Sequence, residues 1–137
     1  MNSKFHLAFK VKDIESTIKF YHTILDCELG RQTKNWVDFN FFGHQLSAHV
    51  SKDIPELDYC GIVENLEVPI PHFGCIVDNT TFNTIKVSLE KHGINFIVKP
   101  QKRYEGKKGT QQTMFILDYS NNALEFKSFE NSEEIFK

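Results

Sequence analysis

Two short runs of alternating apolar and polar residues open the two halves of this chain. In residues 5–11, sequence FHLAFKV, apolar side chains occupy every second position and His6 begins the other face. Residues 72–77, sequence HFGCIV, repeat this arrangement, with His72 beginning the other face. Alternation of this kind predicts half-buried strands, so each histidine is expected on the face turned away from the core.

A helical pattern follows each of these strands. After the first strand, Asp13 can cap a helix whose apolar residues recur at helical spacing, namely Ile14, Ile18, Tyr21, Ile24 and Leu25. After the second strand, a helix is expected from about Thr80 to His92, with Gly93 placed to end it.

Three further strands are expected after each helix. In the first half they are a short strand over residues 28–33, a run over residues 36–42, and the run QLSAHV after a turn at Gly43 and His44. In the second half they are INFIV, TMFILDY and ALEFKSF, with a turn at Asn121 and Asn122 before the last. Residues 51–71 contain prolines and acidic residues without a period, which indicates a connection or a mobile flap.

The repeated order predicts an α+β fold built from two βαβββ modules. The modules cover about residues 1–51 and 71–130, with a connection over about 52–70, inside one domain of 137 residues. We expect the two modules to form an open, barrel-like mixed sheet with the helices outside. The second face of the strands would then line a cleft.

Composition narrows the classes of function. With 40% hydrophobic and 25% charged residues, the chain is typical of a soluble globular protein. A net charge of -2 provides no field that would attract nucleic acid or anionic lipid. The basic residues of one polar segment are interpreted as a solvated surface turn: Lys99, Lys102, Arg103, Lys107 and Lys108.

The cysteines and the N-terminus bear on location. Cys27, Cys60 and Cys75 lack the paired spacing of a zinc ribbon or redox dithiol, so reduced thiols are expected. Neither a signal peptide nor an apolar segment of membrane-spanning length is evident. A cytoplasmic location without a membrane partner is therefore expected.

Side chains that can bind metals recur at matching places of the repeat. His6 and His72 each stand first on the cleft face of their strand, and Glu125 lies on that face of the last strand. The matching strand of the first half presents Gln45, Ser47 and His49, with Ser47 nearest the position that matches Glu125. A single strand histidine is more often a hydrogen-bonded surface or core residue, but three candidates at matching places favour a shared site.

The order of these residues resembles the vicinal oxygen chelate superfamily, which contains glyoxalase I, extradiol dioxygenases and the fosfomycin and bleomycin resistance proteins. The resemblance extends over essentially the whole chain. It rests on His6 in the first strand, a ligand-capable residue in HQLSAHV, His72 in PHFG and Glu125 in NNALEFK. The segment LDYSNNALEFK is similar to the usual ending of the family, although Tyr119 and Asn121 replace the proline and glycine of the turn.

The resemblance implies a divalent metal ion, which could be iron, zinc, nickel, cobalt or manganese. Its ligands would be His6, His72 and Glu125, with a fourth ligand from the strand HQLSAHV. His49 is favoured over Gln45 because imidazole is the better transition-metal ligand, and a bulge or the turn length would offset the strand. Two histidines and one carboxylate leave positions open for a substrate with two adjacent oxygens.

The resemblance also implies a small-molecule enzyme, either a glyoxalase-like lyase or isomerase or a ring-cleaving dioxygenase. Three protein ligands favour dioxygenase chemistry, whereas a fourth favours the glyoxalase arrangement, in which Glu125 also serves as the base. In a dioxygenase, Tyr104 or His49 could supply the acid–base group.

Substrate contacts are expected from two regions. Arg103, Tyr104 and Gln112 flank the entrance of the cleft, where Arg103 could hold a carboxylate or phosphate. Trp36 and Asn40, with Phe42, could shape the pocket or simply pack.

Two alternatives stay open, and both are known in the superfamily. One is a metal-free binding protein of the bleomycin-resistance kind, against which the presence of His6, His72 and Glu125 argues. The other is a thiol transferase of the fosfomycin-resistance kind, for which no clear potassium or phosphonate cluster is evident. A homodimer is expected from the family, with cleft halves from one chain or exchanged between two.

Overall fold

The computed structural model describes residues 2–137 and divides them into two compact units. The first unit contains the described residues up to Glu56 together with Asp118–Asn122, and the second contains Leu57–Leu117 and Ala123–Lys137. The boundary at Glu56 falls within the connection that the sequence predicts. The return of Asp118–Asn122 to the first unit was not expected from the repeat.

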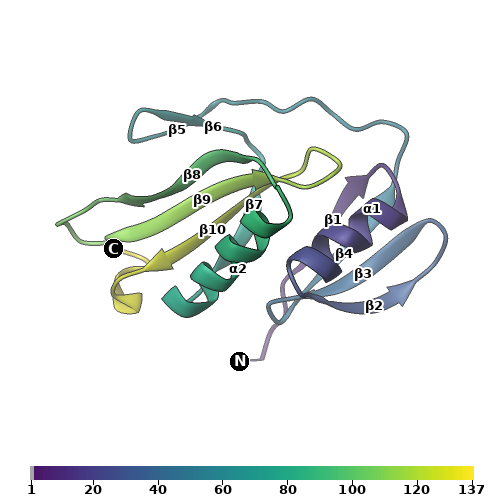
Figure 1. The fold of residues 1–137 in the computed structure, drawn as a ribbon, viewed down its shortest axis with the longest axis horizontal. Helices are drawn as coiled ribbons and strands as arrows, with labels where there is room; N and C mark the ends of the chain where they lie inside the picture. Colours follow the sequence, from purple (N-terminus) through teal and green to yellow (C-terminus); the bar gives the residue numbers. More distant parts are fainter. Residues whose placement is uncertain (1) are drawn as a thin grey trace. The chain divides into compact units, whose positions relative to one another are not determined.

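The first unit is one four-stranded mixed sheet with a helix lying across it (Figure 1). The strand order is β1-β4-β3-β2, in which β1 pairs with β4 in parallel and the other pairs are antiparallel. Its elements are β1 (His6–Val11), α1 (Ile14–Ile18), a π-helical segment (Lys19–Ile24), β2 (Glu28–Gln32), β3 (Trp36–Phe41) and β4 (His44–Val50).

The second unit repeats this topology. Its sheet has the order β7-β10-β9-β8, with β7 and β10 again the parallel pair, and α2 packs against β10. Its elements are β5 (Gly61–Val63), β6 (Leu66–Val68), β7 (Phe73–Ile76), α2 (Asn79–Lys91), β8 (Phe96–Arg103), β9 (Gln111–Leu117), β10 (Ala123–Phe129) and a short 3-10 helix (Ser132–Glu134). The predicted α+β fold with two βαβββ modules is confirmed, and neither sheet closes into a barrel.

The first helix differs from its prediction in one respect. Asp13 caps it as expected, accepting a hydrogen bond of 2.7 Å from the backbone N–H of Ser16. After Ile18 the helix widens into the π-helical segment, which buries Phe20, Tyr21 and Ile24. Apolar spacing therefore predicted the buried face but not the wider turn.

The second helix agrees closely with its prediction. Asp78 caps it through a 2.7 Å hydrogen bond from the N–H of Thr81, and its buried face consists of Phe82, Ile85 and Leu89. Gly93 follows the helix with a φ of 68°, the left-handed conformation in which glycine ends helices without strain.

The structure differs from the predicted strands in three places. The hairpin between β3 and β4 turns at Phe42 and Gly43, both with positive φ, so His44 belongs to β4. Strand β8 continues past Val98 to Arg103, with register shifts near its proline. The expected connection contains the hairpin β5–β6, whose Val63, Leu66 and Val68 pack with Val98 and Phe115.

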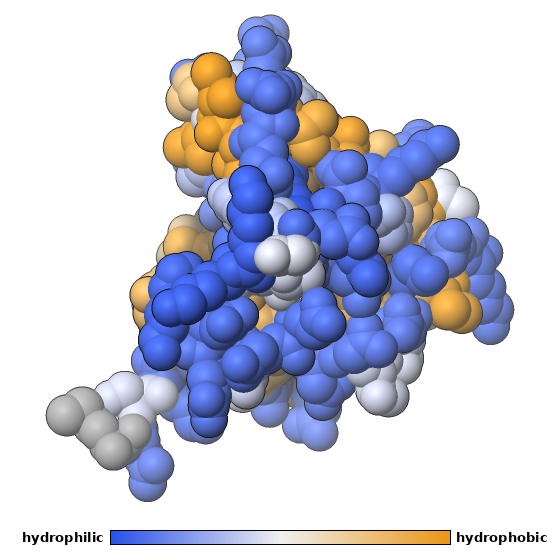
Figure 2. All heavy atoms as spheres, turned by 90° about the vertical axis from the view of Figure 1, so that its left-hand side faces the viewer, coloured by the Kyte–Doolittle hydropathy of each residue, from blue (hydrophilic) through white to orange (hydrophobic). Residues whose placement is uncertain are grey.

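The β5–β6 hairpin also presents apolar side chains to solvent. Ile62 is 73% exposed, and Tyr59 and Ile70 beside the hairpin are partly exposed. In Figure 2 apolar side chains gather near the top of the view, where this hairpin lies. None of the helices among residues 2–137 has the length and apolar character needed to cross a membrane.

A buried carboxylate organises the turn that joins β9 and β10. Asp118 accepts hydrogen bonds from the backbone N–H groups of Ser120 and Asn122, and from the Asn122 side chain. Its Oδ2 atom also accepts a 2.8 Å hydrogen bond from the hydroxyl of the fully buried Tyr21. These bonds tie the turn to the helical segment of the first unit.

Candidate functional site

His72 and Glu125 come together through the parallel pairing of β7 with β10. Glu125 lies opposite Gly74 in this pair, and His72 stands just before β7. The Nε2 atom of His72 is 3.3 Å from Oε1 of Glu125. A Cβ atom on Gly74 would clash with the carbonyl oxygen of Glu125, so only glycine permits this approach of the two strands.

Further hydrogen bonds orient both side chains. Nδ1 of His72 lies 2.7 Å from the carbonyl oxygen of Pro69, which can only accept, so Nδ1 carries a proton. In the neutral ring the lone pair is then on Nε2, the atom turned to Glu125. The hydroxyl of Thr113 donates to Oε2 of Glu125, and Nζ of Lys127 lies 3.8 Å from Oε1.

The electrostatics of the pair follow from these contacts. The hydrogen bond to Glu125 raises the pKa of His72, and partial burial opposes this effect only in part. Burial raises the pKa of Glu125, but the hydrogen bonds from His72 and Thr113 outweigh it, so the pKa is lowered overall. Glu125 is thus an ionised, nearly buried carboxylate near neutral pH, only 8% exposed.

The pair lines a cavity of about 370 Å³ within the second unit. Arg103 and Tyr104 line the same cavity, so four of the predicted site residues meet here. The ring of Phe115 lies beneath two of them: its centroid is 4.9 Å from that of His72 and 5.9 Å from Cζ of Arg103. The interpretation of Arg103 as part of a solvated turn is wrong, because the side chain is 5% exposed.

The ring of His6, in the first unit, has a hydrogen-bond partner at Nδ1, as the ring of His72 does. Its Nδ1 atom is 2.8 Å from Oε1 of Gln45, its direct neighbour in the parallel β1–β4 pair. If the amide oxygen accepts this bond, Nε2 of His6 carries the lone pair, as in His72.

The register of β4 bears on the fourth ligand. Strand β4 pairs with β1 and with β3 over six consecutive residue pairs each, so the expected offset is absent from this stretch. Ser47 lies opposite Ala8, as Glu125 lies opposite Gly74, and therefore occupies the position equivalent to Glu125. His49 lies farther along the strand, opposite Lys10, with its ring 6.2 Å from that of Trp36.

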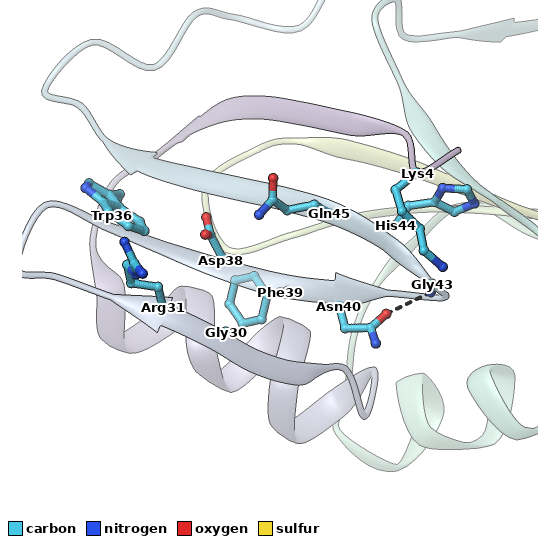
Figure 3. A pocket seen from close by; sticks show the side chains of 10 residues that line it. All are labelled: Lys4, Gly30, Arg31, Trp36, Asp38, Phe39, Asn40, Gly43, His44 and Gln45. Carbon is cyan, nitrogen blue, oxygen red and sulfur yellow. Dashed lines mark hydrogen bonds between the residues drawn. The ribbon is translucent and has the colours of Figure 1, made fainter. Parts of the chain in front are cut away.

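The face of the first sheet carries a wider hollow of about 560 Å³ (Figure 3). Trp36 and Asn40, both predicted pocket residues, line it together with Arg31, Asp38 and Gln45. The side chain of Asn40 accepts a 2.8 Å hydrogen bond from the N–H of Gly43, which secures the hairpin turn. Asp38 accepts a 2.6 Å hydrogen bond from the hydroxyl of Ser47.

Gln112 lies on the face of β9 that points away from the cavity of His72 and Glu125, because side chains alternate between the two faces of a strand. Gln112 donates a 2.7 Å hydrogen bond to Asn79 and lines a different hollow, whereas Gln111 borders both that hollow and the cavity of His72. Thr113, which binds Glu125, was also not predicted. Both Gln111 and Thr113 could have been found in the sequence. They lie on the same face as Phe115 if the alternation along TMFILDY is extended back by two residues.

The donor atoms fit part of a metal site. Residues 2–137 contain no group of three or more His, Cys, Asp or Glu side chains arranged to hold a metal ion. One imidazole nitrogen and one carboxylate oxygen nevertheless converge in the His72–Glu125 pair, each oriented by a second hydrogen bond, as metal ligands commonly are. A divalent transition metal is compatible with these donors.

Comparison with known proteins gives a family match. Residues 5–126 match the family described as the Glyoxalase/Bleomycin resistance protein/Dioxygenase superfamily. A glyoxalase/bleomycin resistance protein/dioxygenase from Alicyclobacillus acidocaldarius is 29% identical, with a TM-score of 0.79 over 98% of this chain and 97% of that chain.

Two further solved structures share the fold at lower identity. The fosfomycin resistance protein FosX from Listeria monocytogenes is 16% identical, with a TM-score of 0.74 and 98% of each chain covered. A virulence protein from Salmonella typhimurium is 21% identical, with a TM-score of 0.64 over 94% of this chain and 98% of that chain.

Proposed function

Because this chain belongs to the glyoxalase/bleomycin resistance protein/dioxygenase superfamily, we propose that it is a divalent-metal-dependent enzyme that acts on a small molecule with two adjacent oxygens. The superfamily expected from the sequence is confirmed. The observation that supports metal dependence is the convergence of His72 Nε2 and Glu125 Oε1 at 3.3 Å. Both side chains are held by partners that leave these two atoms as the donors.

We assign the metal three protein ligands, His72, Glu125 and, as a prediction from the sequence, His6. The state of His6 supports this assignment, because its Nδ1 atom contacts Gln45 and leaves Nε2 as donor. Gln45 then orients His6 and is not itself a ligand. His49 is less suited, since four residues along a strand separate it from Gln45 by about 13 Å. It would instead form a pocket wall with Trp36.

A set of two histidines and one carboxylate favours oxygenase-type chemistry over the four-ligand glyoxalase arrangement. When bound, the metal supplies Lewis acidity and open positions for two substrate oxygens. Thr113 keeps the Glu125 carboxylate in one orientation, and Tyr104 places a hydroxyl at the same cavity where a proton can be donated or accepted. The apolar floor of Phe115 limits water around the reacting groups.

Activity assays with metal-reconstituted protein test this function. The substrates are a catechol, with oxygen consumption as readout, and the hemithioacetal of methylglyoxal and glutathione. Fosfomycin with and without thiol is included because FosX shares the fold. We expect turnover of the catechol that depends on added metal and falls at least about 100-fold in Glu125→Gln, but not in the exposed-residue control Lys102→Gln.

The outcomes separate the alternatives. Thiol-dependent loss of fosfomycin would identify a resistance enzyme instead of an oxygenase. Equal turnover in chelator-treated protein, or in Glu125→Gln, would overturn the proposed role of the metal. Tight ligand binding that chelator does not change, without turnover, would favour the metal-free binding protein. A homodimer, which the family favours, is tested separately by light scattering.

A further inference from the structure

Arg103 is a buried cation that has no anionic partner among the described residues. Its side chain is 5% exposed, and its Nε and Nη2 atoms have no hydrogen-bond partner among the described residues. The remaining nitrogen, Nη1, makes one long contact of 3.5 Å with the carbonyl oxygen of Val63. A charged group is seldom buried without a compensating charge, so this arrangement calls for a partner from outside the chain.

The backbone fixes where Arg103 points. It is the last residue of β8, paired with Gln111 of β9, and Tyr104 follows with a φ of 54°. This left-handed residue turns the chain sharply, and its carbonyl oxygen accepts hydrogen bonds from Lys107 and Thr110. Arg103 is thereby held in the wall of the cavity that also contains His72 and Glu125.

The carboxylates around Arg103 are engaged elsewhere. Glu125 binds Thr113, His72 and Lys127, and Glu64 accepts a hydrogen bond from the backbone N–H of Tyr104. Neither forms an ion pair with Arg103 in the part of the chain that the structure describes. The side chains that line the cavity carry positive charge in excess: Arg103, Lys108, Lys127 and Lys137 against Glu125. The cavity therefore favours an anion.

The two unpartnered nitrogens form one edge of the guanidinium. The N–H groups of Nε and Nη2 point in parallel, which is the geometry that binds two oxygens of a carboxylate or phosphoryl group. We propose that this edge of Arg103 binds an oxyanion group of the substrate, so that the enzyme acts on small acids. This proposal rests on the proposed function, in which one end of the substrate binds the metal through two oxygens. It adds that another part of the substrate carries an anionic group.

The scale of the cavity suits such a molecule. The guanidinium and the His72 ring both lie against Phe115, within reach of one small molecule, and a volume of about 370 Å³ is in the usual range of ligand pockets. The Nε and Nη2 atoms are closed off from solvent, so the ligand must displace their cover. The turn of the β5–β6 hairpin is held over this site by two long, weak contacts. Nη1 of Arg103 lies 3.5 Å from the carbonyl oxygen of Val63, and the backbone N–H of Tyr104 lies 3.3 Å from Oε1 of Glu64.

NMR of the wild-type protein tests the proposal without any variant. Chelator-treated protein is titrated with glycolate, with inorganic phosphate, and with glycolamide as the uncharged match for glycolate. We expect the Nε–H signal of Arg103 and the amide signal of Glu64 to move and saturate at millimolar anion, and not with glycolamide. Glycolate against phosphate shows whether the site takes a carboxylate or a phosphoryl group. An unmoved Arg103 signal with both anions would overturn the proposal.

Variants separate geometry from charge. Arg103→Lys keeps the charge but loses the planar fork, so anion affinity should fall about 10-fold or more. The control Lys102→Gln removes a charge from the adjacent residue on the other side of β8 and should bind as the wild type does. An equal loss of anion affinity in both variants would mean that only the overall positive charge matters, and it would contradict a specific site at Arg103.

Failure of this proposal is distinguishable from failure of the proposed function. The titration uses metal-free protein, so anion binding does not depend on the metal site. Metal content is measured separately in Arg103→Lys, where we expect it to be unchanged. Anion binding by a protein that never takes up metal would contradict the proposed metalloenzyme but support the oxyanion site at Arg103.

Discussion

Nε2 of His72 lies 3.3 Å from Oε1 of Glu125, although one residue precedes β7 and the other lies in β10. The parallel pairing of these strands creates the contact, and Gly74 allows the backbones to come close enough. Without metal the two side chains form a hydrogen-bonded ion pair when His72 is protonated. The same two atoms would be ligands once a metal replaces that proton.

The titration of His72 gives a first prediction. Its hydrogen bond to Glu125 raises its pKa above the ordinary value of 6.5, so metal-free protein should release this proton at higher pH. Because the pKa is raised in the folded state, the stabilisation is fully present below about pH 6.5 and is lost as pH rises through the folded pKa.

NMR of the His72 ring in the presence of chelator measures this pKa directly. The variant Glu125→Gln removes the charge and should lower the pKa of His72. Identical titration curves for His72 in the two proteins would show that Glu125 does not act on it.

Thr113 gives a second prediction. Its hydroxyl donates to Oε2 of Glu125 in a fully buried position, so Thr113→Val leaves that oxygen without its donor. We expect metal affinity to fall about 10- to 100-fold, as for other residues that orient a ligand. Competition with a coloured chelator measures the affinity. Thr113→Ser should restore it, and the exposed helix residue Thr84→Val serves as control; equal effects of the two valine variants would argue against the orienting role.

Gly74 gives a third prediction, which concerns the framework of the site. The added Cβ of Gly74→Ala would meet the carbonyl oxygen of Glu125, and the strands must move apart. We expect the free energy of unfolding to fall by about 2–3 kcal/mol. Urea denaturation measures this loss, with the partly exposed Ile76→Ala of the same strand expected to change stability by about 0.5 kcal/mol or less. An unchanged Gly74→Ala variant would mean that the two strands can separate at no cost.

Tyr21 gives a fourth prediction, for the first unit. Its hydroxyl donates to the buried Asp118, whose pKa burial raises despite several hydrogen bonds. Tyr21→Phe leaves this carboxylate with one donor fewer and should destabilise the protein by about 1.5 kcal/mol. Thermal or urea unfolding tests this, with Tyr59→Phe, a partly exposed tyrosine, as control. Equal stability of Tyr21→Phe and the wild type would show that the bond contributes nothing.

The sequence predicted those features that depend on local period and capping. Alternation around His6 and His72, the cap at Asp13, and the stop at Gly93 each depend on neighbouring residues, and the structure has the corresponding elements. The cap at Asp78 is equally local, and it starts the helix slightly before the predicted Thr80. Features that depend on tertiary contacts were harder to predict. The π-helical turn after Ile18 and the β5–β6 hairpin are examples, since the hairpin gains its stability by packing on Val98 and Phe115.

The candidate site divides in the same way. The order of His6, His72 and Glu125 was visible because it recurs with the repeat. The positions of Gln45 and His49 relative to His6 depend on the register of β4 with β1, which a period of two cannot fix. The burial of Arg103 was hidden because its basic neighbours in sequence are exposed, and only the fold turns this one side chain inward.

Metal content is the most direct test of the central claim that this chain is a metalloenzyme. The protein is purified without chelator or nickel resin, and its metals are quantified together with those of His72→Ala and Glu125→Gln. His92→Gln, at the end of α2, is the matched control. We predict close to one divalent transition metal ion per site in the wild type and the control, a strong loss in the two site variants, and a higher melting temperature on adding metal. Wild-type protein that contains no metal, and whose melting temperature no divalent metal raises, would contradict the account.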